Sequence, residues 1–209
     1  MMKTMIKCAT IVCFLFFSAI SAIAQVALKS EGHDAQYVET IKARSQKIVN
    51  GLKLADAQQA ENVCHIIANR YFLLNDIHET CAQQKRFAKD SVADSKQRQH
   101  IIECAERSRD AELYKHHFEF TATLSLYLND SQVEAVKDGM TYGVVPKTYQ
   151  AHLEMIPSLK DEEKTQILAW LKEAREFAMD AENSNKKHGW FGKYKGRINN
   201  WLTDRKSVV

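Results

Sequence analysis

The chain has 209 residues, of which 45% are hydrophobic and 26% are charged, and its formal net charge is +3. Two of the positive charges, Lys3 and Lys7, lie in the first 24 residues, so the rest of the chain is close to neutral. A chain this balanced lacks the basic field that phosphate binding needs, so we expect no nucleic-acid partner. With only 7 Gly and 2 Pro, the composition favours helices built around one sizeable core.

Residues 1–24 have the pattern of a secretory signal peptide. Lys3 and Lys7 precede the apolar run "CATIVCFLFFSAISAIA", and Ala22-Ile23-Ala24 is a cleavage motif in front of Gln25. The apolar run is short for a membrane span. We therefore predict a cleaved, periplasmic or secreted protein with no transmembrane segment after cleavage and with a flexible segment at 25–34.

From residue 35 onward, apolar residues recur at helical spacing. Asn50-Gly51 is a C-cap signal that predicts the end of a first helix. Asp56, with Gln59 three residues later, has the capping-box pattern that starts the next one. The period is lost only in "KDSVADSKQRQ", 89–99, which indicates a turn. We therefore expect a long helical hairpin from about 57 to 127.

Further helix starts follow the hairpin. Asn129 with Gln132 forms a second capping-box pattern, and the run "QILAWLKEAREFAMDA" after Asp161 is strongly amphipathic. No internal repeat or linker divides the chain. The prediction is an all-α, single-domain bundle of about five or six helices over 35–204, followed by a tail at 205–209.

Glycine and proline are concentrated in two segments, "DGMTYGVVPKTYQAHLEMIP" at 138–157 and "KKHGWFGKYKGRINNWL" at 186–202. The first is expected to be irregular, because Gly and Pro set special backbone geometry. If the second is helical, Trp190, Tyr194, Ile198 and Trp201 share one face, with the glycines opposite. The tryptophans would then seal the core and the glycines would let another backbone lie close. Around them, Lys, Arg and Asn supply the hydrogen bonds that a sugar stacked on an aromatic ring requires.

Searches for other chemistry give no catalytic residue and no cofactor. None of the eight His has a Glu three residues before it, and no H-E-x-x-H is present, so no metal site is predicted. Three cysteines remain after the signal peptide: Cys64, Cys81 and Cys104. Cys81 and Cys104 lie about equally far from the hairpin turn, so they could form a disulfide. The alternative is that both are small residues packed in the core.

The two glycine-containing segments and "ILAWLKEAREFAMDA" resemble the domain of unknown function family 3826, over roughly residues 35–203. That family consists of secreted bacterial proteins labelled as sugar-binding. The resemblance implies work on glycans in the bacterial envelope, and it implies no particular reaction.

These observations lead to one site hypothesis. We expect the two segments to meet at the rim of one cleft, held down by mostly buried Trp190 and Trp201. The residues expected to face a glycan are Tyr142, Tyr149, His188, Tyr194, Lys195, Arg197 and Asn199, although helical spacing groups Tyr194 with the tryptophans.

Three functions stay open at this point. The first is an exported carbohydrate-binding or glycan-processing accessory protein. The second is a periplasmic helical chaperone or interaction protein, because the helix starts after Leu54, Leu128 and Leu159 resemble the "LTxxQ" signature of such chaperones. The third is a polysaccharide hydrolase or lyase whose acid and base are unidentified.

Overall fold

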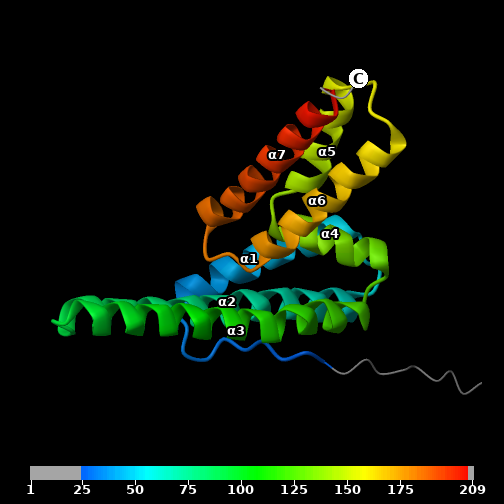
Figure 1. Ribbon diagram of the computed structural model, residues 1–209. Coiled ribbons are helices and arrows are strands. Elements are labelled where there is room, and N and C mark those ends of the chain that lie inside the picture. The colour runs from blue at the N-terminus through cyan, green and yellow to red at the C-terminus, as the bar shows by residue number, and fades with distance from the viewer. Residues whose placement is uncertain (1–24, 207–209) are drawn as a thin grey trace, which may run out of the picture.

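The computed structural model describes residues 25–206. Residues 25–34 contain no helix and are hydrogen-bonded to the second helix of the chain, for example from the Val26 N–H to Asn62 Oδ1 at 2.8 Å. From Ala35 onward the chain is folded into helices joined by short turns (Figure 1). The predicted signal peptide lies outside the described residues. The described helices are α1 (Ala35–Leu52), α2 (Ala57–Ser91), α3 (Ser95–Ser125), α4 (Asp130–Met140), α5 (Val144–Met155), α6 (Asp161–Met179) and α7 (Ser184–Lys206). The all-α prediction is confirmed. Among the described residues, no helix is both long enough and apolar enough to cross a bilayer.

Polar side chains start four of the helices by accepting hydrogen bonds from free backbone N–H groups; these caps are Asp34, Asp56, Asp94 and Asn129. The capping box predicted at Asn129 is confirmed, since the Gln132 side chain accepts from the Asn129 N–H at 3.1 Å. At Asp56 the carboxylate accepts a hydrogen bond from the Gln59 N–H, but the return bond of a capping box, from the Asp56 N–H to the Gln59 side chain, is not formed. The Gln59 side chain instead donates to the backbone carbonyl of Tyr127, which ties the start of α2 to the end of α3.

Two predicted boundaries are wrong. Helix α1 continues through Gly51, and the left-handed residue that ends it is Lys53, with φ of 52°. The turn predicted at 89–99 shrinks to residues 92–94, because the Asp94 carboxylate caps a new helix at Ser95. Helices α2 and α3 therefore form a long antiparallel hairpin whose far end extends beyond α1 (Figure 1).

The segment 138–157 is mostly helical, where an irregular stretch was predicted. It contains the end of α4, a tight turn at 141–143 and the whole of α5. Tyr142 and Gly143 both adopt the left-handed conformation, with φ of 62° and 65°. Gly139 has a packing role instead, because a Cβ there would lie 3.0 Å from the side chain of Ile48 on α1. This segment accounts for a helix beyond the expected five or six.

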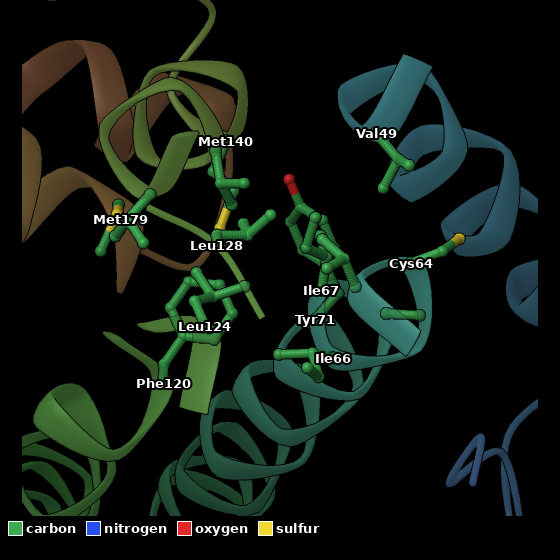
Figure 2. Packing of buried hydrophobic residues seen from close by; sticks show 14 of the residues in the cluster. Val49, Cys64, Ile66, Ile67, Tyr71, Phe120, Leu124, Leu128, Met140 and Met179 are labelled. Carbon is green, nitrogen blue, oxygen red and sulfur yellow. The ribbon is translucent and has the colours of Figure 1, made fainter. Parts of the chain in front are cut away.

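Two hydrophobic clusters make up the core. The first joins α1 and α2 with the end of α3 and with α4, and Figure 2 shows its central residues, among them Ile67, Tyr71 and Leu124. The second joins α5, α6 and α7 through residues such as Ile167, Leu171 and Ile198. Met179, at the end of α6, is buried in the first cluster and connects the two groups of helices. The group α5–α7 stands at an angle on the hairpin (Figure 1).

A candidate ligand-binding surface on helices α6 and α7

The two segments singled out in the sequence do meet. The ring of Tyr142, in the turn after α4, stacks on His188 in the first turns of α7, with ring centroids 5.6 Å apart. Tyr142 is 45% exposed. Its left-handed backbone is unusual for a residue with a large side chain, and Lys147 supports it by donating to the Tyr142 carbonyl at 3.1 Å. This contact joins the segments at one point.

The face of α7 that packs on the core includes Tyr194 and Ile198, as predicted, but it is centred closer to Phe191 and Leu202 than to the tryptophans. Phe191, Tyr194, Ile198 and Leu202 are buried, whereas Trp190 and Trp201 are only partly buried and flank this row. Both tryptophans still have most of their surface covered, so the prediction that they would be mostly buried is confirmed. Tyr194 is 6% exposed and belongs to the second core cluster, so it does not face solvent as a ligand contact.

The glycines of α7 also differ from the prediction. A Cβ placed on Gly189, Gly192 or Gly196 would meet nothing within 4 Å. Within the part of the chain that the structure describes, no backbone packs against them, and their side of α7 is open to solvent.

Helix α7 divides the remaining predicted residues between two flanks. His188, Lys195 and Asn199 recur at the spacing of one helical stripe, and all three are exposed. Arg197 lies on the opposite flank, together with Trp190 and Trp201. Tyr149, on α5, is partly buried against the second core cluster. The five predicted residues on α7 are thus spread around that helix, and the seven predicted residues do not form one cluster.

The flank that carries Arg197 packs along α6 and contains a row of aromatic rings. The Arg197 guanidinium lies 4.4 Å from the ring centroid of Trp170 on α6, and its Nη1 is 3.6 Å from Glu173 Oε2. The Trp170 ring meets Trp201 edge-on at 5.1 Å. Arg205 lies over the other end of this row, 5.0 Å from the Trp201 ring centroid.

The row continues toward the start of α7. Phe177 on α6 stacks on Trp190, with centroids 4.6 Å apart and planes 17° from parallel. The ammonium group of Lys193 lies 5.1 Å from the Trp190 ring centroid. Phe177 is 46% exposed, so this end of the row is open to solvent. We call the row the α6–α7 seam; its rings are Trp170, Phe177, Trp190 and Trp201, and its cations are Lys193, Arg197 and Arg205.

A carboxylate and a phenol complete the seam. Burial raises the pKa of Tyr194, and its hydrogen bond to Glu173 and the charge of that carboxylate raise the pKa further, whereas Arg197 opposes the rise. The Tyr194 hydroxyl therefore stays protonated and holds Glu173 beside Arg197. A guanidinium and a carboxylate fixed next to partly exposed rings can hydrogen-bond neighbouring hydroxyls of a ligand stacked on those rings.

A model of the family described as "Protein of unknown function (DUF3826)" matches residues 38–207. The chain belongs to this family. The match spans the hairpin, the turn at Tyr142 and the whole seam of this DUF3826 protein. No curated protein matches the chain.

A second cluster of charges lies where α6 ends against the hairpin. The Asp180 carboxylate accepts hydrogen bonds from Arg70 at 2.5 Å and from His117 at 2.6 Å. Burial opposes its ionisation, but the His117 hydrogen bond and the charges of Arg70 and His117 outweigh burial and lower the Asp180 pKa. His78 also contacts the Asp180 carbonyl at 2.8 Å. Because these groups neutralise one another across α2, α3 and α6, this Asp180 joint fixes the two groups of helices together.

Two open grooves run along the far part of the hairpin. One, of about 170 Å³, is lined by Cys81, Ala105 and Arg109 among others. The other, of about 650 Å³, is lined by Phe87, His100 and Cys104 among others. These grooves do not include the predicted site residues. Within the described residues, no group of three or more His, Cys, Asp and Glu side chains is placed to hold a metal ion.

The disulfide considered between Cys81 and Cys104 is not formed, and both thiols are free. Cys81 is buried and shares its groove with Ala105, one residue beyond Cys104. One residue corresponds to about 100° around a helix, so Cys104 is turned out of the interface between α2 and α3 and is exposed.

Sequence reasoning found Arg197 and Trp190 but missed their partners on α6. Trp170 and Phe177 are seven residues apart, which places them on one helical stripe. That spacing was visible in "QILAWLKEAREFAMDA", yet it was equally consistent with a stripe buried in the core. Only the antiparallel packing of α6 on α7 shows that both rings lie at the edge of the core.

Proposed function

We propose that this DUF3826 protein is an exported carbohydrate-binding accessory protein of the bacterial envelope, and that the α6–α7 seam is its binding surface. The observation that carries the proposal is the row of partly exposed rings interleaved with guanidinium and ammonium groups. Apolar C–H faces of sugar rings stack on aromatic faces, and sugar hydroxyls need directed donors and acceptors beside them.

The Phe177 end of the seam offers the stacking platform. One face of Phe177 is covered by Trp190, while the residue keeps 46% of its surface exposed. Toward the middle, Arg197 and Glu173 supply the donors and the acceptor, 53% and 48% of their side chains being exposed. A sugar chain lying along the seam would therefore meet rings and polar groups in alternation.

The export half of the proposal depends on the sequence motif at residues 1–24. Mass spectrometry of the protein from its native host should give Gln25 as the first residue. A protein that retains Met1 would contradict export by signal-peptide cleavage.

The binding half is tested with purified residues 25–209 on a glycan array, followed by calorimetry on the best ligand. Arg197→Ala should weaken binding by about 1–3 kcal/mol, because it removes a charged hydrogen bond to the ligand. The fold should persist, since the Arg197–Glu173 ion pair is exposed. Arg107→Ala is the matched control, because Arg107 also forms an exposed ion pair on a helix surface, with Glu103 at 3.0 Å.

Three outcomes separate the candidate functions. Binding that is lost in Arg197→Ala and kept in Arg107→Ala supports the seam as the site. Release of shorter sugars or unsaturated ends would support the hydrolase or lyase function, with Glu173 as the first carboxylate to replace. If no glycan binds, or if both variants bind alike, the proposal fails.

The chaperone function is the second candidate, and a separate observation favours it. Tyr114 and Phe118 on α3 are 72% and 63% exposed and pack against each other edge-on at 5.8 Å. Exposed apolar patches of this kind mark surfaces that bind other proteins. A chaperone should suppress aggregation of an unfolded client, and Phe118→Ser should abolish that effect without changing glycan binding.

A further inference from the structure

Helix α7 carries a large excess of positive charge. It contains seven Lys and Arg residues and a single acidic residue, Asp204, although the whole chain has nearly equal numbers of basic and acidic residues. Most of these cations lie on the solvent side of the helix. The charge asymmetry of the protein is therefore concentrated on the helix that also forms one side of the seam.

Most of the exposed cations of α7 lie on the flank beside the seam. Helical spacing places Lys186, Lys193 and Arg197 along the flank that borders the seam, and Lys195 on the other flank with His188 and Asn199. The exposed glycine face lies between the two flanks, with no side chain to obstruct it. From Lys186 to Arg197 the helix is roughly 16 Å long. A surface of this length and shape suits an extended polymer better than a single small anion.

These cations are poorly compensated within the described part of the chain. Lys186, Lys193 and Lys195 form no ion pair there, and Arg197 reaches Glu173 only at 3.6 Å. Neighbouring like charges on one helix repel each other. An anionic ligand would remove this repulsion, and Arg197 can bind a carboxylate through two parallel hydrogen bonds.

We infer that the ligand of the seam is an acidic polysaccharide, whose carboxylate or sulfate groups bind the cations of α7 while its sugar rings stack on the seam. This inference rests on the proposed carbohydrate-binding function. A membrane surface fits less well, because the row from Phe191 to Leu202 is buried against α5 and α6 and the tryptophans of α7 are only partly exposed, which leaves little apolar surface to enter a bilayer. Nucleic acid fits less well because the chain as a whole is nearly neutral.

The experiment measures binding of residues 25–209 to polygalacturonate and to the same polymer after full methyl esterification. The two ligands share a backbone and differ in charge. Polygalacturonate should bind at least about tenfold more tightly, which corresponds to one charge-assisted contact, and its affinity should fall as sodium chloride is raised. Carrageenan, whose charges are sulfates, is the third ligand and decides which anion is preferred.

Two protein variants assign the effect to α7. Lys186→Glu, on the flank that borders the seam, should reduce binding to the acidic polymer by about tenfold or more and leave binding to the methyl ester unchanged. Lys47→Glu makes the same change of charge at an exposed position on α1 and should change neither affinity.

Each result has a distinct meaning. If the methyl ester binds as tightly as the acid, the inference is wrong while the proposed function stands. If neither carrageenan nor either form of polygalacturonate binds, and the glycan array is also empty, the proposed function fails and the inference with it. If duplex DNA or phosphatidylglycerol vesicles bind as tightly as polygalacturonate, the surface responds to charge alone, and the inference is overturned.

Discussion

Replacing Asp180 by Asn tests whether the Asp180 joint holds the two groups of helices together. The Asp180 carboxylate accepts from Arg70 and from His117. The Arg70 side chain is only 3% exposed, and its other terminal nitrogen donates to the His116 carbonyl at 3.0 Å. An amide at position 180 keeps one oxygen acceptor but removes the negative charge that compensates the buried guanidinium.

The expected loss of stability follows from this burial. Removing one partner of a buried ion pair costs about 3–5 kcal/mol, and the retained acceptor places Asp180→Asn near the lower end, at about 3 kcal/mol. That is a large part of the roughly 5–15 kcal/mol that stabilises a typical domain. With a urea dependence of about 2 kcal/mol per molar, the unfolding midpoint followed by circular dichroism should fall by about 1.5 M.

The effect should also depend on pH. Since the folded Asp180 pKa is lowered, its stabilising contribution is fully present above the unfolded value of about 3.9 and is lost as pH falls below it. The midpoints of the wild type and Asp180→Asn should therefore converge in acid.

The control is Glu79→Gln, which removes a carboxylate from an exposed ion pair with Arg86 and should hardly move the midpoint. If Asp180→Asn unfolds at the same urea concentration as this control, the buried-charge reasoning is refuted.

Three further measurements follow. Lys187 donates to the carbonyls of Ala178 and Met179, and burial lowers its pKa from 10.5 to about 8. Because the unfolded state then binds more protons, the stability of the protein relative to Lys187→Met should rise by on the order of 3 kcal/mol between about pH 8 and pH 10.5. Urea midpoints of the two proteins that stay parallel across this pH range would contradict this prediction. Gly139→Ala should destabilise the protein by about 1–3 kcal/mol, because the added Cβ would press on Ile48. Gly192→Ala has open space around it and should stabilise the protein by up to about 1 kcal/mol. Equal shifts of the melting temperature in the two variants would show that α1 and α4 do not approach closely. Of the three cysteines in the described range, Cys104 alone is exposed, so a maleimide should label one thiol of native residues 25–209 rapidly and all three in denaturant, as counted by mass spectrometry.

The α6–α7 seam shows how far the sequence could predict a site. Arg197 and Trp190 were found because an aromatic and basic segment stood out in a chain otherwise poor in glycine. Tyr194 was included among the ligand contacts although helical spacing already grouped it with the tryptophans expected to face the core, and the structure buries it there. The alternation in this segment did not show whether the tryptophans or the row from Phe191 to Leu202 would face the core.

The sequence by itself determined the local features of this protein. The helical spacing, the caps at Asp56 and Asn129 and the hairpin between α2 and α3 all depend on residues a few positions apart, and short-range backbone preferences fix such features. The tertiary structure alone decided which residues far apart in the chain meet. Asp180 contacts Arg70, which is 110 residues away, and Phe177 and Trp170 line the seam only because α6 packs antiparallel to α7. Such contacts depend on how the apolar faces of whole helices pack together, and the pattern of any single helix does not contain that information.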